Sequence, residues 1–246
     1  RRWKMKPGKP LMNPFGTEDQ VKMNPGVGNP DRLEPAGPVD PGLPVISVQT
    51  PEGRPIALLA NYSLHYVGGT GPGEISADYY GMFAERMKVL LESDHEGFPP
   101  FVAMLSNGTS GNINNVNWFA NEAPPAMPPY TKMRQVANIV AAEAYKTYQN
   151  IKYHNWISLS SAQKEISLGV RLPDQKEIER AKGIIARANG PIMNTMEEIY
   201  ARETMLIKDF PKQVPLIIQA FRVGELAIAA APCEIFVEIG LDIKAK

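Results

Sequence analysis

The sequence predicts an α/β protein in which helices flank a mixed β-sheet, with a small helical subregion and a proline-rich N-terminal arm. Three consecutive stretches carry this prediction. An apolar run of strand length, 53–65, ends at His65, and a second apolar run, 101–106, leads into an asparagine-rich loop at 107–117. Between them, 75–91 has a Ser/Asp start signal and apolar residues at helical spacing. This is the order of a β-α-β unit, and in open α/β sheets ligands bind beyond the carboxyl ends of the strands.

The N-terminal arm comprises residues 1–44. It holds many of the 23 prolines and short sequences such as Asn24-Pro-Gly26 that favour turns. We therefore expect an extended segment that follows the protein surface. Residues 45–50 then alternate as a strand, and a turn at 51–54 joins them as a hairpin to the run that ends at His65.

The remaining elements follow from the same apolar patterns and from turn residues. At least four strands are expected to share one sheet, and two helices are expected to form the small helical subregion at 173–207. The expected elements are a helix at 130–153, one bent strand or two short ones at 156–170, helices at 173–188 and 193–207, a hairpin of strands at 214–223 and 226–231, and a helix from about Glu234.

The composition is that of an ordinary globular protein and excludes some classes of partner. The 246 residues are 43% hydrophobic, which is enough to bury a full core. Lys plus Arg and Asp plus Glu both number 26, so no net positive field favours nucleic acid or an anionic membrane surface. No apolar run reaches the roughly 20 residues that span a bilayer. The single cysteine excludes an internal disulfide framework.

Two residues at predicted strand ends, His65 and Glu234, have side chains that bind zinc. Imidazole and carboxylate are common ligands of catalytic zinc sites, which keep one position open for water or substrate. Simpler roles stay open at this point. From the residues alone, the commoner role for His65 is that of a capped or hydrogen-bonded loop residue, and the commoner role for Glu234 is that of a first-turn glutamate that stabilises its helix through the helix dipole.

The loop at 107–117 also offers a hydroxyl nucleophile. The sequence Gly108-Thr-Ser-Gly-Asn112 approaches the G-x-S-x-G nucleophile elbow, but Asn112 occupies the position of its second glycine. Ser110 is therefore a weak nucleophile candidate. The glycine-rich stretch 68–73 matches neither the dinucleotide fingerprint nor the P-loop, so we interpret it as a flexible rim.

Three separated segments together resemble the neutral/alkaline non-lysosomal ceramidase family of zinc-dependent amide hydrolases. The stretch from Gly53 to His65 is similar to the family's segment that ends in a zinc-binding histidine, and 75–81 to its I-S-G-D-x-x-G. The stretch from Ile218 to Glu234 resembles the strand pair and P-G-E-F corner that carry its zinc-binding glutamate. The resemblance implies that His65 and Glu234 are Zn2+ ligands.

The departures from the family pattern bear on the mechanism. The family sequence G-D-V-S-P-N contains the serine nucleophile, whereas this chain has Gly111-Asn-Ile-Asn114, which puts Asn114 in the position of the serine. The family's other zinc-binding histidine and its zinc-binding tyrosine fall outside residues 1–246, so the resemblance implies one incomplete catalytic domain within a longer polypeptide. Arg1 matches, weakly, an arginine that the family places near a substrate oxygen.

These observations predict a zinc-dependent hydrolase that cleaves an N-acyl or O-acyl substrate, lipids included, with metal-bound water as the nucleophile. The resemblance also implies a role in sphingolipid metabolism and a secreted, periplasmic or cell-surface location. The alternatives are a catalytically silent binding or structural module, which Asn114 favours, and a hydrolase acting through Ser110. The sequence does not name the acyl substrate.

Overall fold

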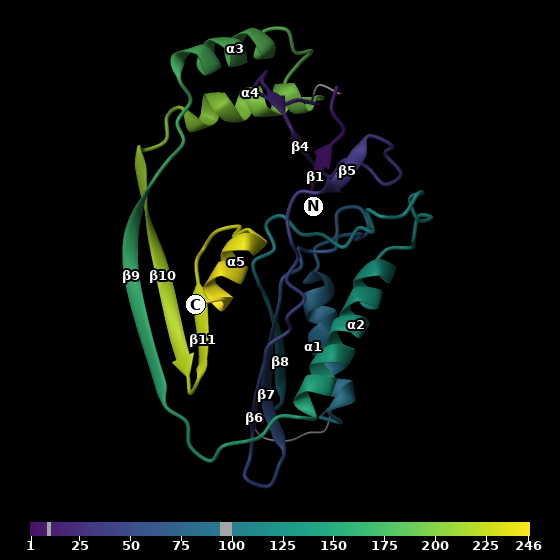
Figure 1. The fold of residues 1–246 in the computed structure, drawn as a ribbon, viewed down its shortest axis with the longest axis vertical. Helices are drawn as coiled ribbons and strands as arrows, with labels where there is room; N and C mark the ends of the chain where they lie inside the picture. Colours follow the sequence, from purple (N-terminus) through teal and green to yellow (C-terminus); the bar gives the residue numbers. More distant parts are fainter. Residues whose placement is uncertain (9–10, 94–99) are drawn as a thin grey trace.

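The computed structural model describes residues 1–8, 11–93 and 100–246, and it confirms the α/β class (Figure 1). The helices are α1 (Asp78–Leu90), α2 (Thr131–Tyr148), α3 (Gln175–Ile185), α4 (Met196–Ile207) and α5 (Val237–Lys244). The strands are β1 (Arg2–Met5), β2 (Leu11–Met12), β3 (Glu18–Asp19), β4 (Val21–Met23), β5 (Arg32–Pro35), β6 (Val45–Gln49), β7 (Pro55–Tyr62), β8 (Val102–Asn107), β9 (Leu159–Gly169), β10 (Gln213–Val223) and β11 (Leu226–Ala230).

The predicted β-α-β unit is formed by β7, α1 and β8. β7 and β8 pair in parallel, from Ala57 opposite Val102 to Tyr62 opposite Asn107, and β6 pairs antiparallel with β7. The sheet is therefore mixed, as predicted. Helices α1 and α2 pack against each other beside it (Figure 1). The core between sheet and helices consists of Leu58, Ala60, Phe83, Met87, Phe101, Ala103, Val140, Ala141 and Ala144.

The expectation that at least four strands share one sheet is wrong for the described residues. β9, β10 and β11 form a second three-stranded antiparallel sheet, separate from β6, β7 and β8 (Figure 1). β9 is one continuous strand of 11 residues that pairs along the whole of β10. A cavity of about 720 Å³, lined by Ile46 and Leu59 on one side and Leu226 to Ala230 on the other, separates the two sheets. The apolar patterns correctly predicted strands but carried no information on which strands pair.

The N-terminal arm is less irregular than its proline content suggests. β1 pairs with β4 and β5 in a small antiparallel sheet, and β2 pairs with β3. Trp3 is the buried side chain of β1, and its ring lies edge-on to Phe119 with centroids 5.3 Å apart. The short strands arise because the arm folds back on itself and on residues far along the chain.

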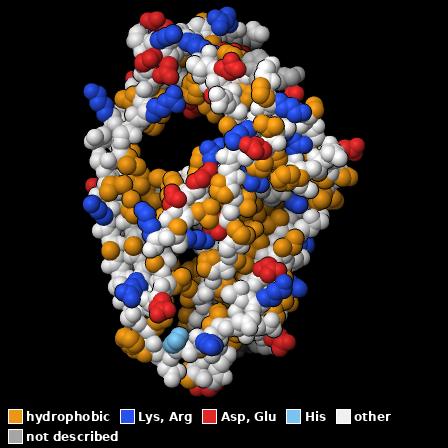
Figure 2. Space-filling model, viewed as in Figure 1, with side chains coloured by type: hydrophobic (Ala, Val, Ile, Leu, Met, Phe, Trp, Pro, Cys, Tyr) orange, Lys and Arg blue, Asp and Glu red, His pale blue; other side chains and the backbone are white. Residues whose placement is uncertain are grey.

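The predicted helical subregion at 173–207 corresponds to the α3–α4 hairpin. Both helices begin with a complete capping box, Asp174 with Glu177 and Thr195 with Glu198. Their shared core is small and contains Ala181, Ile184 and Ala201. Figure 2 shows the molecule hollowed between this hairpin and the remaining structure. Among the described residues, no helix combines the length and the apolar character needed to cross a membrane.

Candidate active site at the strand ends

The loops that follow β7, β8 and β11 converge, although they are far apart in the sequence. Leu64 follows β7, Ile113 lies in the loop after β8, and Val237 begins α5 after β11. The three side chains belong to one buried cluster, together with Tyr79 of α1 and Met133 of α2. The structure thus brings the three predicted site loops to one end of the molecule's core.

The first turn of α1 holds the backbone on both sides of His65. The hydroxyls of Tyr79 and Tyr80 donate to the Leu64 carbonyl at 2.8 and 3.1 Å. The Asp78 carboxylate accepts from the N–H groups of Val67 and Gly68, both at 2.8 Å. Burial raises the pKa of both tyrosines, so both hydroxyls stay protonated and remain donors. The His65 loop is therefore fixed on each side of the imidazole.

His65 itself is half-buried, and its ring lies beside that of Tyr66 with centroids 4.2 Å apart. Within the described part of the chain, the imidazole has no hydrogen-bond partner, and neither does the carboxylate of Glu234. Both side chains are thus available to a ligand. The role of His65 as a hydrogen-bonded loop residue has no support in this arrangement.

Glu234 lies just before α5, not in its first turn as the sequence predicted. α5 begins at Val237, and the acidic residue of its first turn is Glu238. Two tight backbone hydrogen bonds, from Cys233 to Ala231 and from Ile235 to Cys233, bend the chain between β11 and the helix. Glu234 is exposed and lines the cavity between the two sheets. Stabilisation of α5 through the helix dipole therefore falls to Glu238.

The asparagine-rich loop packs directly against the segment that carries Glu234 and is hydrogen-bonded to it. The Gly111 N–H donates to the Ile235 carbonyl at 2.9 Å, and the Asn112 Oδ1 accepts from the Val237 N–H at 3.0 Å. A side chain at Gly111 would place its Cβ 2.7 Å from the carbonyl oxygen of Glu234, so only glycine allows this approach. The close packing fixes Glu234 relative to the loop.

A charged pair extends this contact to the N-terminal arm. The Asn112 Nδ2 donates to the Glu238 Oε2 at 2.8 Å, and Arg2 donates to the other carboxylate oxygen. The Arg2 guanidinium also lies over the Phe236 ring, 5.0 Å from its centroid. Burial alone would raise the pKa of Glu238, but its own backbone N–H, Asn112 and Arg2 together hold that pKa below its usual value.

Asn114, which occupies the position of the family's serine, is held through both ends of its amide. Its Nδ2 donates to the Asn24 Oδ1 at 2.7 Å, and its Oδ1 accepts from the Trp118 indole N–H at 2.9 Å. The main-chain nitrogen of Arg1 donates to the same Asn24 oxygen at 2.9 Å. Arg1 and Asn114 therefore meet at Asn24. The sequence indicated only a turn at Asn24, because no local pattern shows a contact across 90 residues.

Ser110 is buried and its hydroxyl is already engaged. Its side chain is only 2% exposed, and its Oγ donates to the Asn107 Oδ1 at 2.8 Å. The neighbouring acceptor is an amide oxygen, which is not a general base. This geometry favours a role in shaping the loop and argues against Ser110 as the nucleophile.

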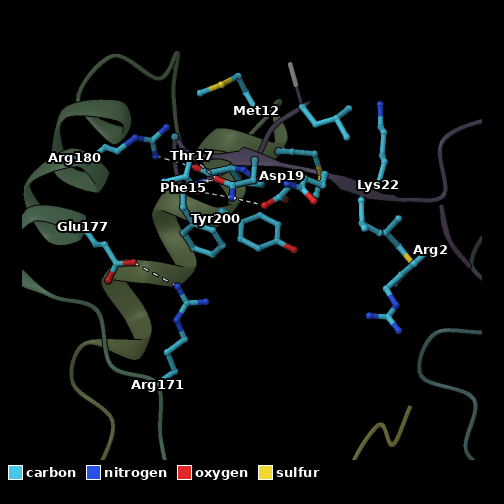
Figure 3. A pocket seen from close by; sticks show the side chains of 18 of the residues that line it. Arg2, Met12, Phe15, Thr17, Asp19, Lys22, Arg171, Glu177, Arg180 and Tyr200 are labelled. Carbon is cyan, nitrogen blue, oxygen red and sulfur yellow. Dashed lines mark hydrogen bonds and ion pairs between the residues drawn. The ribbon is translucent and has the colours of Figure 1, made fainter. Parts of the chain in front are cut away.

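A second and larger hollow lies away from these loops, between the arm and the α3–α4 hairpin, with a volume of about 1280 Å³ (Figure 3). Its charged side chains are largely paired. Arg171 lies 3.6 Å from Glu177 and over the Phe15 ring, and Arg180 donates to the Pro14 carbonyl. Phe15 also meets Tyr200 edge-on. None of the predicted site residues lines this hollow.

By chemical type, two of the predicted site residues suit a metal ion. His65 and Glu234 supply one imidazole and one carboxylate, both without protein partners, and these are the donor types of a catalytic zinc site. Among the described residues, no group of three or more His, Cys, Asp or Glu side chains could hold a metal ion.

Comparisons with known proteins place the fold. Neither family models nor curated proteins match the sequence. The structure is similar to solved structures that include the neutral ceramidase from Pseudomonas aeruginosa, at 20% identity and a TM-score of 0.55, and a ceramidase complexed with C2, at 16% identity and a TM-score of 0.55. Each match covers 84% of this chain but only 36% and 38% of the ceramidases.

The chain thus has a ceramidase-like α/β fold. It spans little more than a third of the length of the ceramidases that it matches. At this level of identity the likeness shows the fold alone. The fold supports the resemblance that the sequence segments indicated.

Proposed function

We propose that this chain carries part of the active site of a metal-dependent hydrolase of the neutral ceramidase type, which cleaves an amide or ester bond in an N-acyl or O-acyl substrate. The observation that supports it most is the convergence of the loops bearing His65, Asn114 and Glu234 within a ceramidase-like fold. Lipids, sphingolipids among them, are the proposed substrates. A secreted, periplasmic or cell-surface location is part of the same proposal.

His65 and Glu234 are the residues that would hold the metal ion, which we propose to be zinc. When bound there, zinc would polarise the scissile carbonyl and provide a nucleophile from water near neutral pH. The chain's own contribution is to fix both ligands. Tyr79, Tyr80 and Asp78 hold the His65 loop, and the close approach of Gly111 holds the backbone of Glu234.

Asn114 is proposed to stabilise the negative charge that develops on the attacked carbonyl. Its amide has two N–H bonds, of which one is used by Asn24, so the other is free to donate to an oxyanion. A donor of this type typically contributes about 10²–10³ in rate. Arg1 is a candidate for a second donor, because its main-chain nitrogen meets Asn114 at the Asn24 oxygen.

A catalytically silent binding or structural module is the second candidate. The observation that favours it is the amide at position 114, because an amide cannot act as the family's serine nucleophile. Hydrolysis through Ser110 is the third, and the burial of that hydroxyl weighs against it.

Metal analysis and hydrolysis assays on the full-length protein separate these functions. With zinc and a panel of N-acyl and O-acyl substrates, we expect turnover that His65→Ala abolishes together with metal binding. Asn114→Ala should retain the metal and lose only about 10²–10³ in rate. His154→Ala is the matched control, because His154 is an exposed histidine remote in sequence from the site loops.

Two outcomes would redirect the assignment. Bound zinc without turnover of any substrate would favour the silent module, most clearly if Asn114→Ser then created ceramidase activity. Loss of activity in Ser110→Ala, with the metal retained and the fold intact, would favour the Ser110 hydrolase.

A further inference from the structure

The Asn114 side chain has a defined orientation that two neighbours determine. The Trp118 indole nitrogen can only donate, so the atom that it contacts at 2.9 Å must be the Asn114 oxygen. The Val116 N–H, at 3.4 Å, also points to this oxygen. The amide NH₂ group is then necessarily on the other side. There it meets the oxygen of Asn24 at 2.7 Å.

Asn24 is suited to accept this hydrogen bond because its own environment fixes its oxygen. That oxygen also accepts from the Arg1 main-chain nitrogen at 2.9 Å, so both of its lone pairs are used. The backbone of Asn24 has a positive φ of 51°, a conformation that asparagine tolerates better than most residues. Its N–H in turn donates to the Arg1 carbonyl at 3.2 Å. Asn24 thus links the arm to the asparagine-rich loop.

Trp118 is buried, with 6% of its surface exposed, and its backbone N–H donates to the Val116 carbonyl at 3.1 Å. Its ring therefore cannot move away from Asn114 without disturbing the loop. Asn114 itself remains partly exposed. The contacts of the Asn114 side chain with Asn24 and Trp118 are therefore fixed by the protein. The second N–H of the Asn114 amide has no partner among the described residues.

We propose that Trp118 and Asn24 are positioning residues that lock the Asn114 amide with one N–H free to bind the substrate's developing oxyanion. This inference rests on the proposed function and adds the means by which the donor is oriented. An amide free to rotate would present its oxygen to the oxyanion in part of the population, which would repel the negative charge. The lock removes that orientation.

The orientation can be tested without any activity, by NMR of the full-length protein labelled with 15N-asparagine. Trp118→Phe keeps the ring but removes the indole N–H, and Asn24→Gly removes the acceptor while glycine accepts the positive φ. Both changes should shift the two side-chain amide proton signals of Asn114. Asn24→Asp retains an acceptor oxygen and should leave them close to their original positions.

The matched control is Trp156→Phe, because Trp156 is 80% exposed. It should move none of the Asn114 signals. Unchanged Asn114 signals in both Trp118→Phe and Asn24→Gly, in variants that retain the wild-type fold by circular dichroism, would overturn the lock. This result would leave the proposed hydrolase function standing.

The catalytic consequence is tested by steady-state kinetics on the same variants. Trp118→Phe and Asn24→Gly should each lower kcat by about tenfold, a part of the loss expected for Asn114→Ala, with KM within about twofold of wild type. Asn24→Asp should restore most of the rate. Shifted NMR signals with unchanged kcat would overturn the positioning role, whereas a wild-type protein inert toward all substrates would overturn the proposed function alone.

Discussion

The α3–α4 hairpin and the loop cluster at the strand ends are held together in opposite ways. The hairpin depends largely on neighbours in sequence, since its capping boxes join residues three apart and its buried core consists of Ala181, Ile184 and Ala201, and it meets the arm through Phe15 and Pro14. The loop cluster depends on distant partners. Asn114 binds Asn24 across 90 residues, and Asn112 binds Glu238 across 126.

The difference predicts how each region responds to damage. A small, locally bonded hairpin can open without unfolding the remainder, because few buried contacts tie it to other elements. In the loop cluster, Leu64, Ile113 and Val237 are buried together with Tyr79 of α1 and Met133 of α2, so we expect its geometry to depend on the packing of these helices. The candidate site is therefore expected to be less independent of the helices than the hairpin is.

The largest expected effect on stability comes from the core between the β6–β8 sheet and helices α1 and α2. Phe83 is fully buried between the sheet and the helices, and Phe83→Ala should lower the free energy of unfolding by about 3–5 kcal/mol. Ile184→Ala in the hairpin should cost less and act locally. Urea unfolding followed by circular dichroism, with hydrogen exchange to locate the opening, distinguishes the two. If both variants lowered the free energy of unfolding equally and opened the whole protein, the proposed difference between the core and the hairpin would be wrong.

Asn112→Ala should destabilise the contact between the asparagine-rich loop and α5 without affecting the α3–α4 hairpin. The change leaves the buried Val237 N–H without its acceptor and removes the donor to Glu238, which should cost about 1–3 kcal/mol. Faster hydrogen exchange should appear in α5 and not in α3 or α4. Asn121→Ala, at an exposed asparagine, is the control and should be nearly neutral.

Acid should weaken the contacts that Glu238 makes with Asn112 and Arg2. Glu238 and Asp40 both have a pKa held below the usual value. Burial opposes this in each case, but hydrogen bonds and a cation, Arg2 for Glu238 and Lys244 for Asp40, outweigh it. A lowered folded-state pKa contributes stability above the unfolded pKa and loses it as pH falls through the folded value.

The measurement for this prediction is urea unfolding from about pH 6 to about pH 3, which spans the ordinary carboxyl range. Stability should fall with pH in the wild type and fall less steeply in Glu238→Gln, because that side chain no longer titrates. Identical pH slopes for the two proteins would contradict a stabilising role for the Glu238 carboxylate.

The smallest effect concerns the hairpin caps. Asp174→Ala removes the side chain that accepts from the Glu177 N–H at 2.7 Å and should destabilise α3 by about 1 kcal/mol. Local hydrogen exchange in α3 is the sensitive measurement. The loop cluster should be unaffected, and altered signals from Asn114 would show that the two regions are more strongly coupled than their contacts suggest.

The same contrast explains what the sequence could predict. The helices of the hairpin were predicted because caps and apolar spacing are local signals, and the β7-α1-β8 unit was predicted for the same reason. The number of strands per sheet and the bonds to Asn24 and Trp118 were not, because pairing partners and long-range hydrogen bonds leave no local pattern. The first-turn position predicted for Glu234 is wrong because the helix expected from about Glu234 begins at Val237, after the bend at 231–235.

The most direct test of the central claim is a zinc titration of the full-length protein, with the heat of binding measured by calorimetry. The titration compares the wild type with His65→Ala, Glu234→Gln and the control His154→Ala. The account predicts saturable binding of one ion in the wild type and the control, with binding strongly weakened in both site variants. Wild-type zinc affinity in both His65→Ala and Glu234→Gln would contradict it.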